Sequence, residues 1–124
     1  MSEMAKHVVI ADDSPIIRKA LCRLFKDEED YDICAEAADG QEAIDLALKH
    51  HPDLIIMDLS MPVLNGLEAS RKLKEIMPDV PIILFTQHAN AGITLRNSNH
   101  AFDRVVSKGD PRVLMEQVRS LAPA

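Results

Sequence analysis

The chain has 124 residues, 47% of them hydrophobic, and its formal net charge is −6. This length and apolar content suit a single domain with one substantial core. The acidic balance and the lack of any Lys/Arg run argue against a surface for nucleic acid or anionic membranes. No apolar stretch approaches the roughly 20 residues that span a bilayer, and the N-terminus lacks the apolar core of a signal peptide. We therefore expect a cytoplasmic domain that by itself binds neither nucleic acid nor membrane.

The cysteines and paired histidines give little support for a metal site. Cys22 and Cys34 are too few and too isolated to form a disulfide framework or a metal cluster. One falls in an apolar helical pattern and the other in a predicted strand, so we expect both to be small buried hydrophobic side chains. His50 and His51 are adjacent at a predicted helix end, where they point to different sides.

The first predicted strand is the apolar run at residues 7–11, and two acids end it, Asp12 and Asp13. Ser14 and Pro15 have the residue types of a helix N-cap and a first helical position. The following helix has apolar residues at helical spacing, which predicts one inward face. This face consists of Ile16, Ile17, Ala20, Leu21, Leu24 and Phe25.

The second predicted unit is a weaker strand at residues 33–37 followed by a helix. Asp39 and Glu42 have the spacing of a capping box, which predicts that the helix begins between them. The residues expected inward are Ala43, Ile44, Ala47 and Leu48.

The third strand ends at an acid. Residues 54–57 are four consecutive apolar residues, typical of a strand buried on both faces in a parallel sheet. Asp58 ends the run, and Pro62 has no N–H with which to continue a ladder. We therefore expect Asp58 at the carboxyl end of a central strand, which is where ligands bind in open α/β sheets.

Two further units complete the pattern. Asn65 is predicted to cap the helix that follows the third strand. Residues 80–86 are predicted to form a buried strand that ends at Thr86, and residues 105–107 a short strand before Lys108. Asp110 with its following proline is predicted to cap the last helix. A helix within residues 87–100 is expected on topological grounds alone. Inward positions on the two supported helices are Leu67, Ser70, Leu73, Ile76 and Met77, then Leu114, Val118 and Leu121.

Strands that alternate with helices predict an α/β fold of five βα units, with a parallel sheet covered on both faces. The whole chain, residues 1–124, is expected to form one such domain, with a core from about residue 6 to residue 122. Right-handed crossovers bring the carboxyl ends of all parallel strands to one edge of the sheet. The polar residues that end the strands should therefore meet there.

Three carboxylates, one hydroxyl and one lysine are expected at this edge. Asp12, Asp13 and Asp58 would repel one another, and a divalent cation would relieve that repulsion. Oxygen ligands suit Mg²⁺, and Lys108 and Thr86 add one positive charge and one donor. This set suits in-line phosphoryl transfer. Because no Gly-rich loop ending in Lys-Ser/Thr indicates bound ATP, the expected acceptor is an Asp carboxylate of the domain itself.

The chain resembles the receiver domain of two-component response regulators over nearly its whole length. The motifs that carry the resemblance are Ala11-Asp12-Asp13-Ser14-Pro15, Asp39-Gly40-Gln41-Glu42-Ala43, Pro52-Asp53, Asp58 to Pro62 with Asn65-Gly66, Thr86 and Lys108. Each motif is weak alone, but together, in order and at this spacing, they are highly specific. The resemblance implies a doubly wound, flavodoxin-like (βα)5 fold with strand order 2-1-3-4-5.

The resemblance also implies the roles of the site residues. Asp58 is then the phosphoacceptor, and it binds Mg²⁺ together with Asp12, Asp13 and the backbone carbonyl of Ser60. The switch hydroxyl is Thr86, and Lys108 contacts the phosphoryl oxygens.

Partners and kinetics follow from the same resemblance. The expected phosphodonor is a sensor histidine kinase or a phosphotransfer protein. A homodimer would form through the fourth helix, fifth strand and fifth helix. Ser60 and His88, two residues beyond Asp58 and Thr86, are expected to tune the rate of dephosphorylation. Such a module catalyses only its own phosphorylation and dephosphorylation. The first half of the chain is closest in pattern to receivers that precede helix-turn-helix DNA-binding domains.

Three positions depart from the family pattern. Val105 stands where the family usually has Tyr or Phe, residues 100–104 replace a Gly-containing turn, and Gly109 replaces a Pro after the lysine. Val105 has no ring to swing inward, so the resemblance does not supply an aromatic switch. We therefore expect phosphorylation to change order within residues 87–104, with Phe102 as an alternative anchor.

Two other functions fit parts of the same pattern. A degenerate receiver could serve as a phosphorylation-independent binding scaffold, but all five chemical positions are present. A Mg²⁺-dependent phosphohydrolase could use Asp58 as its nucleophile, but that class would have a second acid two residues later, where this chain has Ser60. Turnover of a generic phosphate ester separates the hydrolase from the receiver.

Overall fold

The computed structural model describes residues 4–87 and 101–124. Five parallel strands form one sheet in the order β2-β1-β3-β4-β5, which confirms the predicted topology. The elements, in chain order, are β1 (Lys6–Ala11), α1 (Pro15–Lys26), β2 (Tyr31–Ala37), α2 (Gly40–His50), β3 (Leu54–Met57), α3 (Gly66–Ile76), β4 (Ile82–Thr86), β5 (Arg104–Ser107) and α5 (Pro111–Leu121). None of the helices in the described parts is long and apolar enough to cross a membrane.

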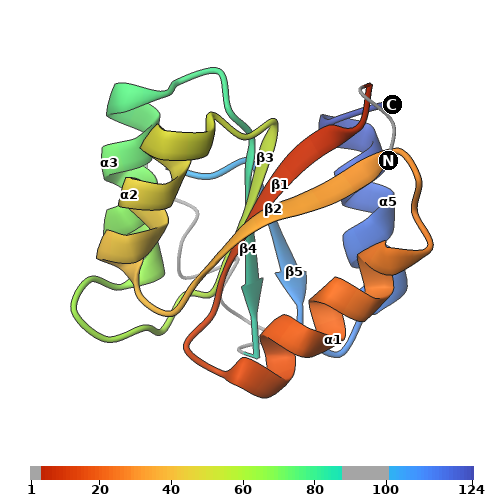
Figure 1. The fold of residues 1–124 in the computed structure, drawn as a ribbon. Coiled ribbons are helices and arrows are strands. Elements are labelled where there is room, and N and C mark those ends of the chain that lie inside the picture. Colours follow the sequence, from red (N-terminus) through yellow and green to blue (C-terminus); the bar gives the residue numbers. More distant parts are fainter. Residues whose placement is uncertain (1–3, 88–100) are drawn as a thin grey trace.

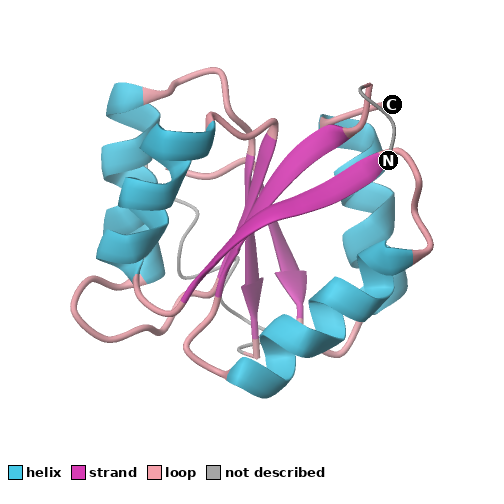
Figure 2. Ribbon diagram, viewed as in Figure 1, coloured by secondary structure: helices cyan, strands magenta, loops and turns pink. Residues whose placement is uncertain are grey.

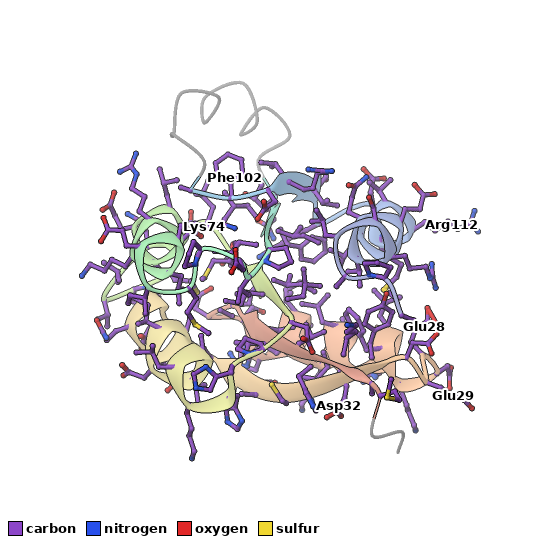
Figure 3. The ribbon with its side chains drawn as sticks, turned by 90° about the horizontal axis from the view of Figure 1, so that it is seen from above. Glu28, Glu29, Asp32, Lys74, Phe102 and Arg112 are labelled. Carbon is purple, nitrogen blue, oxygen red and sulfur yellow. The ribbon has the colours of Figure 1, made fainter. Side chains whose placement is uncertain are left out.

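Helices cover both faces of the sheet. Helices α2 and α3 lie on one side and α1 and α5 on the other (Figures 1 and 2). Two hydrophobic clusters fill the layers between the sheet and these helix pairs. The central strands β1, β3 and β4 supply most of the fully buried side chains, which is why their sequences are apolar at successive positions. Figure 3 shows Phe102 in the segment that leads into β5 and Asp32 on β2, the strand at the opposite edge of the sheet.

The strand register brings the carboxyl ends together. Ala11 at the end of β1 pairs with Met57 at the end of β3, and Met57 pairs with Leu84 in β4. Thr86 at the end of β4 pairs with Ser107 at the end of β5. The residues that directly follow β1, β3 and β5 therefore share the lower edge of the sheet in Figure 1, where the arrowheads of β4 and β5 point.

Side-chain caps start three of the helices as predicted. The backbone N–H three residues into each helix donates to the side chain of the cap residue. These bonds run from Ile17 to Ser14 Oγ (3.3 Å), from Glu42 to Asp39 Oδ1 (2.8 Å) and from Glu68 to Asn65 Oδ1 (2.9 Å). Asp110 is the N-cap residue of α5 and Pro111 begins the helix, as predicted, although the Asp110 side chain makes no cap hydrogen bond.

Some residues predicted to face inward are exposed. Ile16 is 78% exposed, because it lies about 140° around α1 from the buried Leu21. Ala20 on the same helix is also exposed. Leu48 and Ile76 are exposed because each lies beyond the last core-packed residue of its helix.

Three more residues are less buried than predicted, and one predicted helix is not described by the structure. Both Cys22 and Cys34 are half-buried and free, not fully buried. Leu121 is half-buried as well. Residues 88–100, which hold nearly all of the helix expected within residues 87–100 and the side chain of His88, lie outside the described residues.

Candidate functional site

Three carboxylates meet where β1 and β3 end. Asp12, Asp13 and Asp58 each offer an oxygen, and these oxygens all lie within 4.8 Å of one another. Asp12 and Asp58 are buried, with 1% and 6% of their surface exposed, whereas Asp13 is exposed. The cluster is therefore accessible to solvent on the side of Asp13, and the sequence prediction that these three residues converge is confirmed.

Lys108 is the cation within this cluster. Its Nζ lies 2.7 Å from Asp12 Oδ2 and 3.2 Å from Asp58 Oδ1, and its side chain is only 10% exposed. Asp12 Oδ2 accepts no well-aligned hydrogen bond from the described residues, despite this short ion pair. One lysine cannot balance three carboxylates, so the ionised site has an excess of negative charge.

The charges in the site shift one another's pKa. Burial raises the pKa of Asp58, and the neighbouring Asp12 raises it further; Lys108 and the Ser60 N–H oppose this without cancelling it. Burial by itself would lower the pKa of Lys108, but its contacts with Asp12 and Asp58 outweigh burial and raise it. The lysine is therefore charged at neutral pH, and the metal-free site disfavours ionised Asp58.

Backbone hydrogen bonds fix Asp12 and Asp58. The N–H of Asp12 donates to Ala37 O (3.0 Å), and the N–H of Asp58 donates to Ala11 O (2.8 Å). The Asp12 carboxylate is oriented as well, because Ser14 N–H donates to its Oδ1 at 2.9 Å. Oδ1 is thus engaged by the backbone, while Oδ2 faces Lys108.

A glycine at the start of α3 packs on the backbone of the predicted phosphoacceptor. A Cβ on Gly66 would lie 1.9 Å from the carbonyl oxygen of Asp58, so no other residue fits there without a shift. The N–H of Gly66 donates to Leu59 O at 2.8 Å. The sequence motif contains this glycine, but only the structure shows that it is needed for close approach.

The loop between β3 and α3 also contains a strained residue that the sequence did not indicate. Val63 has φ 67° and is 82% exposed. The N–H of Leu64 donates to Pro62 O at 2.7 Å, which closes a γ-turn around Val63. A β-branched residue is strained in this region of backbone space. Its strain is maintained from outside the loop, because Gly40 N–H donates to Leu64 O at 3.0 Å.

The other predicted site residues lie around the cluster. Thr86 is buried at the end of β4, and its carbonyl accepts the N–H of Lys108 at 2.8 Å. Ser60 is exposed, and with Asp13 it lines a pocket of about 640 Å³. Val105 is half-buried and packs on the cluster between the sheet and helices α2 and α3, as does Phe102. Their functional roles stay predictions.

The donor set fits Mg²⁺. All the available ligand atoms are oxygens, and neither His nor Cys belongs to the cluster. Among residues 4–87 and 101–124, this is the one group of three or more potential ligands close enough to hold a metal ion. The negative excess and the poorly satisfied Asp12 Oδ2 are the features that a divalent cation would relieve.

The family model of the response regulator receiver domain matches residues 8–119. This chain belongs to that family. Receiver domains of two-component response regulators are phosphoacceptor signalling modules and are in general not enzymes, and the acidic pocket of such a module is present here. The alternatives of a scaffold and of a hydrolase are not favoured.

Individual relatives agree with this assignment. The receiver is 31% identical to the transcriptional regulatory protein DegU of Brevibacillus brevis over 123 residues, which cover 98% of this chain but 52% of DegU. The chain thus spans about half the length of that relative.

Solved structures give the same fold. A two-component response regulator of the LuxR family from Aurantimonas sp. SI85-9A1 superposes with a TM-score of 0.86 at 31% identity, covering 95% of this chain and 85% of that one. The response regulator domain of Thermotoga maritima CheB also gives a TM-score of 0.86, at 25% identity over 97% of this chain and 98% of that one.

Proposed function

We propose that this receiver accepts a phosphoryl group on Asp58. The observation that carries the proposal is the position of this carboxylate, which is buried at the end of β3 between Asp12 and Lys108. Asp13, on the solvent side of the same cluster, leaves the site accessible to a donor. The receiver unit is the whole chain, with its core at about residues 6–122.

In the proposed reaction, a carboxylate oxygen of Asp58 attacks phosphorus and forms the O–P bond of an aspartyl phosphate. The bond from phosphorus to the donor breaks at the same time, and the donor leaves with that electron pair. Lys108 Nζ already lies 3.2 Å from Asp58 Oδ1, so it needs little movement to hold a phosphoryl oxygen. The Thr86 hydroxyl is the second proposed contact.

We propose Mg²⁺ as the cofactor. Asp12, Asp13, Asp58 and the backbone carbonyl of Ser60 would hold the ion. When bound, it supplies positive charge that offsets the carboxylates and the transferring phosphoryl oxygens. This role agrees with the negative excess of the site.

The proposed phosphodonor is a sensor histidine kinase or a phosphotransfer protein. Ile16 and Ala20 expose apolar surface on α1, the helix that follows Asp13. Beside them, a mostly apolar groove of about 440 Å³ lies between α1 and α5 and reaches Lys108. A donor protein seated on this surface would present its phosphoryl group next to the site.

The output of the receiver stays a prediction. Val105 has no aromatic ring, but Phe102 packs on the same hydrophobic cluster and is the proposed anchor of the switch. The proposed dimer would use the surface that includes β5 and α5. Tuning of dephosphorylation by Ser60 and His88 and the cytoplasmic location also stay predictions.

Labelling with acetyl phosphate tests the proposal. With Mg²⁺, intact-mass analysis should show one phosphoryl group on the wild-type chain and none on Asp58→Asn. The matched control is Asp79→Asn, which removes the same charge from an exposed acid and should label like wild type. Full labelling of Asp58→Asn would show that the phosphoacceptor is another residue. Absence of label from the wild type would contradict phosphoacceptor function.

A further inference from the structure

Arg18 of α1 contacts the acidic loop and strand β2 at once. Its Nη1 donates to the backbone carbonyl of Asp12 at 2.6 Å. Its Nε lies 3.4 Å from Glu36 Oε1, near the end of β2. The Arg18 side chain is only 19% exposed, although a charged residue on an amphipathic helix would ordinarily face solvent.

The contact with Asp12 acts on two carboxylates, because the Asp12 carbonyl belongs to the peptide bond that joins Asp12 to Asp13. The N–H of Asp12 is already held by Ala37 O at 3.0 Å. With Arg18 on the carbonyl, both the peptide before Asp12 and the peptide after it are fixed. The directions in which the Asp12 and Asp13 side chains leave the backbone are then fixed too.

Glu36 makes this arrangement compatible with a cation site. A guanidinium close to the acidic loop would, by charge alone, weaken the binding of a divalent cation. The Glu36 carboxylate offsets that charge and also orients the planar fork of Arg18. Arg18 therefore fixes the loop through its hydrogen bond to Asp12, and because Glu36 offsets the charge of Arg18, the guanidinium weakens cation binding only slightly.

We infer that Arg18 is a positioning residue for the metal site, oriented by Glu36. This inference rests on the proposed function, because it concerns binding of Mg²⁺ by Asp12 and Asp13. Groups that orient metal ligands typically change metal affinity by 10–100-fold when they are mutated. The role differs from that of Lys108, which contacts the carboxylates themselves.

Calorimetric titration with Mg²⁺ alone tests the inference, because the two possible roles of Arg18 predict opposite changes in Mg²⁺ affinity when Arg18 is replaced. If Arg18 positions the loop, Arg18→Met should weaken Mg²⁺ affinity by about tenfold. If Arg18 acted only as a nearby positive charge, the same variant should bind Mg²⁺ more tightly than wild type. Unchanged or tighter binding would therefore overturn the positioning role.

Three further variants sharpen the comparison. Lys19→Met removes an exposed positive charge from the same helix and should bind Mg²⁺ as tightly as wild type or slightly more tightly. Arg18→Lys retains the charge but loses the two-sided fork, so its affinity should fall between those of wild type and Arg18→Met. Glu36→Gln should weaken Mg²⁺ affinity by less than about tenfold, and less than Arg18→Met does, because the Arg18 bond to the Asp12 carbonyl remains while its orienting and charge-offsetting partner is lost. If Arg18→Met does not fold, Arg18→Lys carries the test.

Labelling by acetyl phosphate separates positioning from general damage. Arg18→Met should need more Mg²⁺ than wild type for half-maximal labelling, but saturating Mg²⁺ should restore one phosphoryl group per chain. A loss of label that saturating Mg²⁺ does not restore would contradict the inference. If the wild type itself binds no Mg²⁺, the proposed function fails; if the wild type binds and Arg18→Met binds equally, only the role of Arg18 fails.

Discussion

The two edges of the sheet each contain a lysine paired with aspartate, and the two arrangements differ in how well their groups are satisfied. At the amino edge, Lys74 Nζ lies 2.8 Å from Asp103 Oδ2 and also donates to Val80 O at 2.8 Å. Asp103 Oδ2 accepts the Ile82 N–H as well, at 2.8 Å. Figure 3 labels Lys74 beside α3, the helix to which it belongs.

The carboxyl edge of the sheet has the same residue types, lysine and aspartate, but more negative than positive charges. One lysine, Lys108, faces three carboxylates, and Asp12 Oδ2 accepts no well-aligned hydrogen bond from the described part of the chain. The amino-edge network matches one cation with one anion and fills both with hydrogen bonds, which is typical of a structural contact. The carboxyl-edge cluster has unmatched negative charge, which is typical of a site that binds a cation and reacts.

The largest effect that separates the two edges is expected from Lys108→Met. Without this lysine, two buried carboxylates lose their counter-charge, and the free energy of unfolding of the metal-free protein should fall by about 3 kcal/mol. Saturating Mg²⁺ should narrow this difference from wild type, because the bound ion replaces the positive charge that the two carboxylates have lost. Urea unfolding with and without Mg²⁺ measures this. A variant as stable as wild type without metal would contradict the proposed charge balance.

Lys74→Met is expected to have a smaller effect that Mg²⁺ does not change. The variant loses charge-assisted hydrogen bonds to Asp103 and Val80, worth about 2 kcal/mol. The same urea experiment checks this, with Lys72→Met as the exposed control on the same helix. Mg²⁺ should stabilise this variant and wild type by the same amount, so a difference between them that shrinks or grows with Mg²⁺ would mean that the two edges are not independent.

The smallest effect concerns the pH dependence contributed by Asp58. Its pKa is raised in the folded protein, so the folded state binds more protons than the unfolded state above the ordinary Asp value of 3.8. Without metal, stability should therefore decline as pH rises from that value through the raised pKa. Asp58→Asn should remove this decline and be more stable than wild type at neutral pH. Urea midpoints between pH 4 and 7 test this, and a steeper decline in the variant would contradict the sign of the shift.

Much of the site could be predicted because short stretches of the sequence determine where each strand ends. Apolar runs end at Asp12, Asp58 and Thr86, and parallel strands place such end positions on one edge whatever the details of packing. The same logic predicted the sheet and its helices. The phase and the end of a helix are coded less sharply. Ile16 was expected inside but lies on the outer side of α1, and Ile76 was expected inside but lies beyond the last core-packed residue of α3.

The contacts that could not be predicted join residues far apart in the chain or depend on backbone geometry. Lys74 and Asp103 carry no local signal that they pair. Val63 adopts a positive φ because Gly40, more than twenty residues earlier in the chain, holds the carbonyl of the next residue. Arg18 fits the polar side of an amphipathic helix, and nothing in its neighbours indicates a bond to Asp12.

Chemical trapping of the phosphorylated residue tests the central claim most directly. Sodium borohydride reduces an acyl phosphate to an alcohol, so an aspartyl phosphate becomes homoserine, which peptide mass spectrometry can locate. After treatment with acetyl phosphate and Mg²⁺, we predict homoserine at position 58 and none when Mg²⁺ is removed by a chelator. Homoserine at another aspartate, or at position 58 to the same extent without Mg²⁺, would contradict the account.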